Sequence, residues 1–414
     1  MFTKRHLDNG IPVVMEQLRN FRSVLVGVWV KVGSRHEAPE KSGVSHFLEH
    51  MFFKGTKKRT AADLAIAIDS LGGDLNAFTS RETTAFYVKV LDEYVEKGVD
   101  LLADIFLHST FLEEEIEKEK SVIKEEIKLV EDTPDDYIHD LFSRTVWGDE
   151  GLGQPVLGRR ETIRAFTRED LLGHVRKYYG LSDTVVACAG NFDTDHVLDL
   201  LNHYLGSLRR GSEPRTIPQP FFKGATAVYP KDLSELHMCL GVEGPPFASR
   251  DRYAIALLNS ILGAGVSSRL FQEIREKKGY AYSIYSFVSA YHDTGFWAVY
   301  AGTGKRKATA VVDLIIGEMR GLADTISDDE VRRAKEQIKG NVILGLESTS
   351  NRMQSIARQE IYHGRYFSEK EILREIEAVT QTQVKDLCRR LINNGKMSMT
   401  LLGPAHEEDF KGAV

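Results

Sequence analysis

The sequence contains only three cysteines, Cys188, Cys239 and Cys388, which lie far apart in the chain. Their number is odd and no two of them form a CxxC pair, so the sequence predicts no disulfide framework. We expect reduced, structural thiols, which are usual in proteins of the cytoplasm or a comparable reducing compartment. A cytoplasmic location is therefore expected.

A long apolar run is also lacking. The longest candidate, VLVGVWVKVG from Val24, is rich in β-branched residues and is interrupted by Lys31, which is typical of a strand. It is far shorter than the roughly 20 residues that a membrane-spanning helix needs. The N-terminal residues MFTKRHLDNGIPVV carry charge, but no apolar segment follows that would complete a secretory signal. We expect neither a signal peptide nor a membrane partner.

The chain has no excess of positive charge. Lys and Arg number 54 and Asp and Glu number 60, which makes the formal net charge −6. Such a chain has no surplus of cations to displace counterions from phosphates, so the sequence argues against a general nucleic-acid-binding protein. The acidic balance instead favours a neutral or basic substrate or partner.

The 414 residues are enough for two domains of about 200 residues each. The stretch RRGSEPRTIPQP, residues 209–220, contains three prolines. It is the best candidate for a linker, because proline biases the residue before it away from helix. We therefore predict an N-terminal half, residues 1–208, and a C-terminal half, residues 221–414.

The two halves repeat each other in outline. The first ends with TREDLLGHVRKYYGLSDTVVACAG (167–190) and the second with TQTQVKDLCRRLINNGKMSMTLLG (380–403). Each segment predicts an amphipathic helix, a polar turn and a buried strand closed by glycine. The match favours an internal duplication, although strand–helix units also resemble one another without a common origin.

Strand patterns alternate with long helical patterns. VLVGVWVKV and TTAFYVKV predict strands, whereas AADLAIAIDSLG, EYVEKGVDLLADIFLH and EEEIEKEKSVIKEEIKLVE predict helices. Strands separated by turns, together with helices in runs, favour an α+β fold. We predict two homologous half-domains, each a mainly antiparallel sheet with helices packed on one face.

The segment HFLEH combines two histidines and a glutamate at helical spacing. Positions i and i+4 of a helix lie on one face, with i+3 beside them, so His46 and His50 can direct two imidazoles to one point next to the Glu49 carboxylate. Two neutral imidazoles suit Zn²⁺, and a carboxylate that is not a ligand can accept a proton from water there. The same residues could instead be polar positions on an exposed helix face, because short motifs recur by chance.

A catalytic zinc site needs a third protein ligand. The helix pattern EEEIEKEKSVIKEEIKLVE offers several glutamates, although long charged helices usually only solvate a surface. Spacing alone does not choose among Glu115, Glu117, Glu119, Glu125 and Glu126.

HFLEH matches the inverted zinc motif HxxEH of the inverzincins. The surrounding residues resemble the M16 (pitrilysin-type) metallopeptidase family, which includes insulin-degrading enzyme and the mitochondrial processing peptidase. The resemblance rests on GSRHE, GVSHFLEHMFFKGT, LGGDLNAFTSRETTAFYV, EKEKSVIKEEI, GQPVLG and SSRLFQEIREKKGYAYSI. These segments follow the family's order over nearly the whole chain, and the length resembles that of the processing-peptidase-like bacterial branch.

The resemblance implies one Zn²⁺ per chain, with His46, His50 and Glu126 as ligands and Glu49 as the general base. It also implies a supporting role for Glu119, which lies seven residues before Glu126 and so on the same helical face. A plain surface residue is the alternative reading of Glu119.

The second half carries no zinc motif, because Asn259 and Gly263 stand where a repeat of the two histidines would fall. The resemblance implies that this half supplies a wall of an enclosed chamber, the two halves forming a clamshell. From this half, Arg275 and Tyr282 match the family's Arg–Tyr pair, with Tyr280 as the local competitor for the tyrosine. An arginine can hold a substrate, and a tyrosine hydroxyl can donate to a developing oxyanion.

The stretch DLNAFTS is similar to the family's substrate-binding edge strand. The resemblance implies that Asn76, Ala77 and Phe78 bind an extended peptide by adding it to the edge of the sheet. The alternative is an ordinary turn and strand after the preceding glycine pair.

These residues predict a zinc-dependent endopeptidase that cleaves unfolded peptides or precursor segments inside the chamber, with zinc-activated water and Glu49 as the general base. The expected partners are an extended, preferably basic peptide and a second copy of the chain in a homodimer. One alternative is a non-catalytic or partner-dependent subunit or peptide-binding scaffold of a processing complex. Such relatives tend to lose HxxEH or the distal glutamate, which this chain keeps. The other alternative is an unrelated zinc hydrolase.

Overall fold

The computed structural model describes residues 1–208, 217, 219–393, 396–410 and 412. Of the predicted linker 209–220, residues 209–216 and 218 lie outside the described residues. The chain divides into two compact units. Unit 1 contains Met1–Lys128, Gln154–Ile217 and Leu344–Tyr366, and unit 2 contains Leu129–Gly153, Pro218–Ile343 and Phe367–Val414.

Each unit includes a segment from the other half of the sequence. Helix α5 (Pro134–Trp147) belongs to unit 2, and helix α12 (Thr349–His363) belongs to unit 1. The compact units therefore differ from the continuous halves, 1–208 and 221–414, that the linker predicts. The reason is packing, because each of these two helices buries its apolar side chains against the sheet of the unit that contains it.

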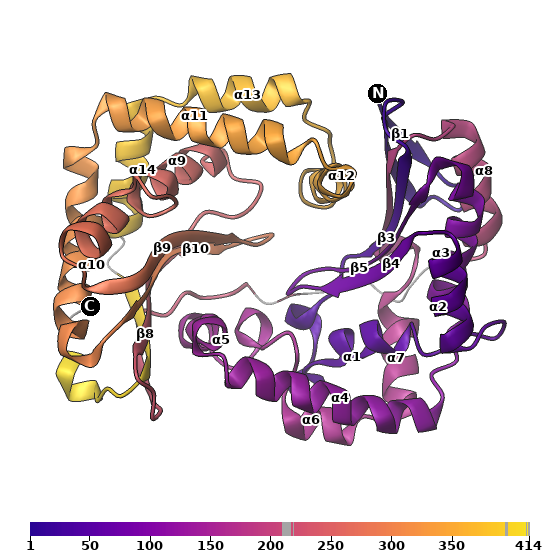
Figure 1. Cartoon of the computed structure of the whole chain (residues 1–414), viewed down its shortest axis with the longest axis horizontal. Coiled ribbons are helices and arrows are strands. Elements are labelled where there is room, and N and C mark those ends of the chain that lie inside the picture. Colours follow the sequence, from indigo (N-terminus) through magenta and orange to yellow (C-terminus); the bar gives the residue numbers. More distant parts are fainter. Residues whose placement is uncertain (209–216, 218, 394–395, 411, 413–414) are drawn as a thin grey trace. The chain divides into compact units, whose positions relative to one another are not determined.

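Unit 1 is built on a six-stranded sheet (Figure 1). Its strands, in spatial order, are β1 (Phe2–His6), β2 (Pro12–Gln17), β6 (Thr184–Gly190), β3 (Ser23–Val30), β5 (Thr84–Leu91) and β4 (Asp74–Thr79). Neighbouring strands are antiparallel except for β2 and β6. The sheet thus leaves β4 at one edge, paired only with β5 among the described strands.

Unit 2 is built on a five-stranded sheet with the same order of strands. It contains β7 (Thr226–Pro230), β11 (Met397–Gly403), β8 (Leu236–Gly244), β10 (Gly295–Thr303) and β9 (Ala281–Ala290). Only β7 and β11 are parallel neighbours. The order matches that of unit 1 without β1, which supports the duplication and confirms the α+β prediction of two mainly antiparallel sheets.

Helices make up the rest of both units. Unit 1 also contains α1 (Val44–Met51), α2 (Ala61–Ser70), α3 (Val95–His108), most of α4 (Glu113–Glu131), α6 (Arg160–Ala165), α7 (Arg168–Tyr178) and α8 (Thr194–Leu205). Unit 2 also contains α9 (Arg252–Leu262), α10 (Ala308–Thr325), most of α11 (Asp328–Gly345), α13 (Glu369–Ala378) and α14 (Gln381–Asn393). The predicted helices AADLAIAIDSLG, EYVEKGVDLLADIFLH and EEEIEKEKSVIKEEIKLVE correspond to α2, α3 and α4.

The sheet of unit 1 has helices on both faces, which explains the uninterrupted apolar sequence of β3. Val24 and Val26 pack into the core beneath α3 and α8. The alternate residues Leu25 and Trp29 pack against α12, where the Trp29 indole N–H donates to the Met353 sulfur at 3.4 Å. The predicted layer of helices on one face is present, and α12 adds a helix on the other face (Figure 1).

The three cysteines are buried and free, as predicted. Within the described part of the chain, every helix is too short or too polar to span a bilayer. The cytoplasmic location stays a prediction.

Candidate metal centre

Helix α1 carries both histidines and is anchored at its N-terminus. The residue that caps this end, Gly43, has φ +92°, and a Cβ there would lie 2.6 Å from the Cα of Gly158, so the position requires glycine. The buried Glu37 carboxylate accepts hydrogen bonds from the backbone N–H groups of Gly43 and Ser45, at 2.6 and 2.7 Å. A carboxylate at this end satisfies otherwise free donors of the helix. With Phe47 fully buried on the other side, the helix is held firmly in place.

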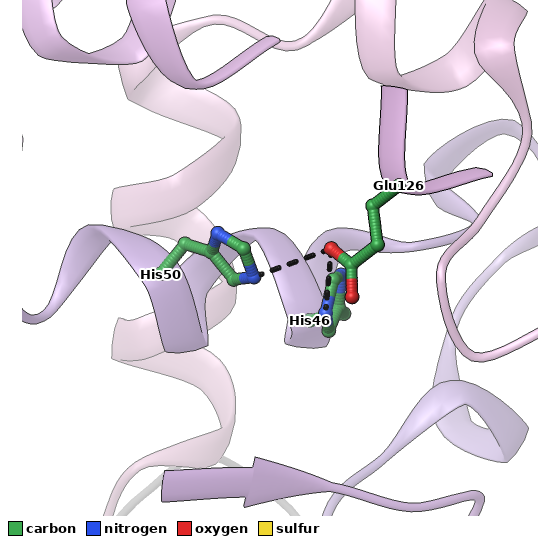
Figure 2. Close-up of side chains that lie close together, drawn as sticks. All are labelled: His46, His50 and Glu126. Carbon is green, nitrogen blue, oxygen red and sulfur yellow. Dashed lines mark ion pairs between the residues drawn. The ribbon is translucent and has the colours of Figure 1, made fainter. Parts of the chain in front are cut away.

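His46 and His50 point from α1 toward Glu126 on α4 (Figure 2). Their Nε2 atoms lie 3.7 and 3.6 Å from the same Glu126 oxygen, Oε2. These distances are too long for hydrogen bonds. Two ligands that bind one tetrahedral zinc at about 2.1 Å are themselves separated by roughly 3.4 Å. The three atoms therefore enclose a space that fits one metal ion, and no other group of three such ligands is found among the described residues.

His46 is in the protonation state that a metal ligand needs. Its side chain is buried, and burial, followed by the charge of nearby His50, lowers its pKa to about 3. The imidazole is therefore neutral around pH 7 and has a lone pair to offer.

Glu119 contacts the far side of the His50 ring. Its Oε1 lies 2.8 Å from His50 Nδ1, and its Oε2 lies 2.7 Å from the ammonium group of Lys54. Glu119 is only 2% exposed, which excludes the alternative of a plain surface residue. A carboxylate bonded to the second nitrogen of an imidazole fixes the orientation of that ring, as occurs around metal-binding histidines.

Negative charge is concentrated around His50. Burial lowers the pKa of His50, but the hydrogen bond to Glu119 and the charges of Glu119, Glu126 and Glu49 raise it overall. The same potential that favours a proton on the ring favours a divalent cation at its Nε2. For Glu119, burial raises the pKa, while the bonds and charges of His50 and Lys54 lower it overall, so the carboxylate is ionised.

Glu49 lies beside the histidines and is held by strand β4. Its Oε2 accepts a hydrogen bond from the Thr79 hydroxyl at 2.5 Å. Burial raises the pKa of Glu49, against the hydrogen bond from Thr79 and the charge of His50, and the negative charge of Glu126 adds to the increase. A carboxylate with a raised pKa is a stronger proton acceptor, as a general base should be.

The predicted substrate strand is the edge strand β4. Asn76 is exposed, and its side-chain oxygen accepts a hydrogen bond from the Ala77 backbone N–H at 2.8 Å. Phe78 instead packs edge-on against Trp29, with ring centroids 5.2 Å apart. The edge needed for β-augmentation is present, while the peptide-binding roles of these residues stay predictions.

Arg275 and Tyr282 lie in unit 2 and contact each other. The Arg275 guanidinium lies 5.6 Å from the centroid of the Tyr282 ring. Tyr282, at the start of β9, is 79% exposed. The competitor Tyr280 differs, because its ring is covered by the Lys307 ammonium at 4.5 Å.

The other glutamates of α4 do not join the cluster. Glu115 forms an ion pair with Lys118, Glu117 forms one with Lys120, and Glu125 is exposed. Of the five candidates, only Glu119 and Glu126 contact the histidines in the described residues.

The sequence analysis missed three residues that support this centre: Glu37, Lys54 and Thr79. Lys54 comes four residues after His50, so helical spacing could have indicated that it lies on the same side. Thr79 belongs to the strand that was singled out, but nothing in its sequence indicated a contact with Glu49. Glu37 ends the segment GSRHE, which carries part of the resemblance, but nothing in that segment indicates a contact with the start of α1.

The duplicated α+β fold thus brings two histidines and a glutamate around a space that fits one cation, with a second glutamate at its side. Comparison with known proteins gives the family. Residues 12–160 match the family described as Insulinase (Peptidase family M16), and residues 165–338 match the one described as Peptidase M16 inactive domain. The chain belongs to peptidase family M16, as its resemblance predicts.

Relatives of similar length support this assignment. The uncharacterized zinc protease YmxG of Bacillus subtilis (strain 168) is 40% identical over 406 residues, which is 98% of this chain and 99% of the relative. An uncharacterized zinc protease of Mycobacterium leprae (strain TN) is 40% identical over 405 residues, which is 96% of this chain and 91% of the relative.

Solved structures share the fold. A protease from Helicobacter pylori superimposes with a TM-score of 0.90 at 26% identity, covering 98% of this chain and 99% of the other. A peptidase M16 inactive domain from Pseudomonas fluorescens has a TM-score of 0.91 at 19% identity, covering 98% of each chain, and is similar in fold.

Proposed function

We propose that this protein is a zinc-dependent endopeptidase that cleaves unfolded peptides or precursor segments. The observation that carries the proposal is the approach of the His46 and His50 Nε2 atoms to one Glu126 oxygen, with Glu49 beside them. The names of the relatives, which are called zinc proteases, support zinc as the metal.

His46, His50 and Glu126 would hold one zinc ion per chain. Two neutral imidazoles and a carboxylate are a usual ligand set for catalytic zinc, which keeps a fourth position open. When bound, zinc lowers the pKa of water toward about 7 and polarises the carbonyl group of the scissile bond.

Glu49 acts as the general base. It takes a proton from the attacking water and later delivers it to the nitrogen of the leaving amine. The Thr79 hydroxyl holds Oε2 of this carboxylate, so we assign the proton transfer to Oε1. The fixed carboxylate has no reorganisation to undergo when the proton moves.

Strand β4 binds the substrate in this proposal. An extended peptide adds to the free edge of the sheet through main-chain hydrogen bonds, which give affinity with little dependence on sequence. The Ala77 amide would have to exchange its bond to Asn76 for one to the peptide. Phe78, packed against Trp29, would contribute by shaping the strand.

We further propose that Arg275 and Tyr282 bind the substrate from the second half, the arginine by holding the peptide and the tyrosine by donating to the oxyanion.

Tyr282→Phe should lower kcat by roughly 10²-fold, the effect of losing one oxyanion donor, and should leave the zinc affinity unchanged. Peptide hydrolysis and a zinc titration measure the two effects. Tyr280→Phe is the matched control, since that ring is engaged with Lys307. Equal losses in both variants would contradict the assignment.

Cleavage of a quenched, unstructured basic peptide by the purified protein tests the proposed function. We expect cleavage that stops with a zinc chelator and returns when zinc is added. An acidic peptide of the same length is the control for the preference that the net charge of −6 suggests. No cleavage despite one bound zinc per chain would indicate the alternative, a partner-dependent or non-catalytic subunit.

We also propose that the chain forms a homodimer, which the mass of the purified protein tests. Its mass in solution, measured by light scattering, should be twice the chain mass of 46.6 kDa. A monomer that still cleaves the peptide would refute the dimer and leave the peptidase proposal intact.

A further inference from the structure

We propose that Lys54 is a positioning residue of the metal centre, which acts by holding Glu119 in the orientation that fixes the His50 ring. The inference rests on the zinc site of the proposed function. It does not depend on whether the protein cleaves peptides.

The first argument is the geometry of the Glu119 carboxylate. Each oxygen has its own partner: Oε1 meets His50 Nδ1 at 2.8 Å, and Oε2 meets Lys54 Nζ at 2.7 Å. With both oxygens bonded, the carboxylate cannot rotate without breaking one of the two contacts. The bond to Lys54 therefore helps determine where Oε1 lies and, through it, how the imidazole is turned.

The second argument is the position of Lys54 in the chain. It lies three residues after the end of α1, and its backbone N–H donates to the Met51 carbonyl at 3.2 Å, which continues the turn. The lysine and the imidazole therefore reach the same carboxylate from one segment, while the carboxylate comes from α4. The contact ties the end of α1 to the helix that also carries Glu126.

The third argument is charge. Three carboxylates place negative charge near His50, those of Glu49, Glu119 and Glu126. Of these residues, Glu119 is only 2% exposed. A buried carboxylate is strongly unfavourable unless it is paired and hydrogen-bonded. The ammonium of Lys54, whose side chain is 31% exposed, supplies that pairing. Lys54 and one divalent cation together balance the formal charge of the three carboxylates.

Zinc affinity, measured by competition with a chromophoric chelator, tests the inference. In Lys54→Met we expect an affinity about tenfold weaker, the lower end of the effect of removing an outer partner of a metal ligand. Removing a positive charge would by itself strengthen cation binding, so a weaker affinity distinguishes lost positioning from simple electrostatics. Lys54→Arg should restore most of the affinity, because its guanidinium can also bond the carboxylate.

A double variant tests whether Lys54 acts through Glu119. Glu119→Gln should weaken zinc binding by at least as much as Lys54→Met, and the two changes together should be no worse than Glu119→Gln alone, because coupled residues are not additive. Lys58→Met, at an exposed lysine four residues further along the chain, is the matched control and should not change the affinity.

Two results would overturn the inference: full zinc affinity in Lys54→Met, or additive losses in the double variant. If Lys54→Met does not fold, as judged by circular dichroism, Lys54→Ala removes the same ammonium group and gives the same comparison. Absence of zinc binding by the unchanged protein would refute the proposed function, and this inference with it. Full zinc affinity in Lys54→Met, with zinc still bound by the unchanged protein, would refute this inference alone.

Discussion

Glu49→Gln should keep the zinc affinity of the protein and lower kcat for peptide cleavage by about 10²- to 10⁴-fold, the range over which a positioned base accelerates a reaction. The substitution keeps the size of the side chain and an oxygen that can accept the bond from Thr79. It removes the negative charge of Glu49 and, with it, the ability to take up a proton, while the three side chains that converge on the metal position stay unchanged. Because Glu49 is not among the three converging ligands, the metal site is left intact.

Two measurements on the same preparation decide this prediction. Zinc content is determined for the folded variant, and kcat is determined at saturating peptide. Bound zinc with kcat within a few-fold of the unchanged protein would remove Glu49 from the role of base. Loss of both zinc and activity would show instead that Glu49 helps to hold the metal.

Glu126→Gln should have the opposite effect on the metal. We expect the zinc affinity to fall by at least 10²-fold and peptide cleavage to disappear at low zinc. The change replaces an anionic ligand with a neutral amide at the point nearest both Nε2 atoms, and hard or borderline cations bind carboxylate much better than amide. Adding zinc in excess should recover part of the activity.

The neighbouring Glu125 provides the matched control. It lies on the same helix one residue earlier and is exposed. Glu125→Gln removes the same charge from α4 but should change neither zinc affinity nor cleavage. Equal effects of the two substitutions would mean that α4 acts through its overall charge and that Glu126 is not a ligand.

Spacing along the sequence predicts which side chains share one face of a helix. The four-residue spacing of His46 and His50 predicts that both rings share a helix face, and the structure places them with their centroids 4.6 Å apart. The seven-residue spacing of Glu119 and Glu126 predicts a shared face on α4 in the same way. Periodicity along one helix is a local property, so it is legible in the sequence.

Spacing along the sequence does not identify which glutamate of α4 is the third metal ligand. Five of them fitted the pattern, and only the resemblance to a known family singled out Glu126. The structure gives the physical reason, because Ile116, Ile123 and Ile127 face the core and determine which side of α4 lies against α1. That orientation depends on packing with distant segments, so the spacing of residues within α4 does not reveal it.

Domain boundaries show the same limit. A proline-rich stretch predicts a division into continuous halves, yet α5 and α12 pack in units built mostly from the other half. Each of these helices buries one apolar face. The order of apolar residues in a helix does not say which sheet covers that face, because the matching apolar surface, such as Leu25 and Trp29 for α12, is far away in the sequence.

The sequence by itself therefore determined the α+β elements, the histidine pair and the glutamate between them, since each depends on residues a few positions apart. Only the tertiary structure decided that the Thr79 hydroxyl donates to Glu49 and that Lys54 and His50 both contact the Glu119 carboxylate. It also decided that Oε2 of Glu126 lies close to the Nε2 atoms of both histidines. Those contacts join strands and helices that are distant along the chain. Their geometry is determined by how the core packs.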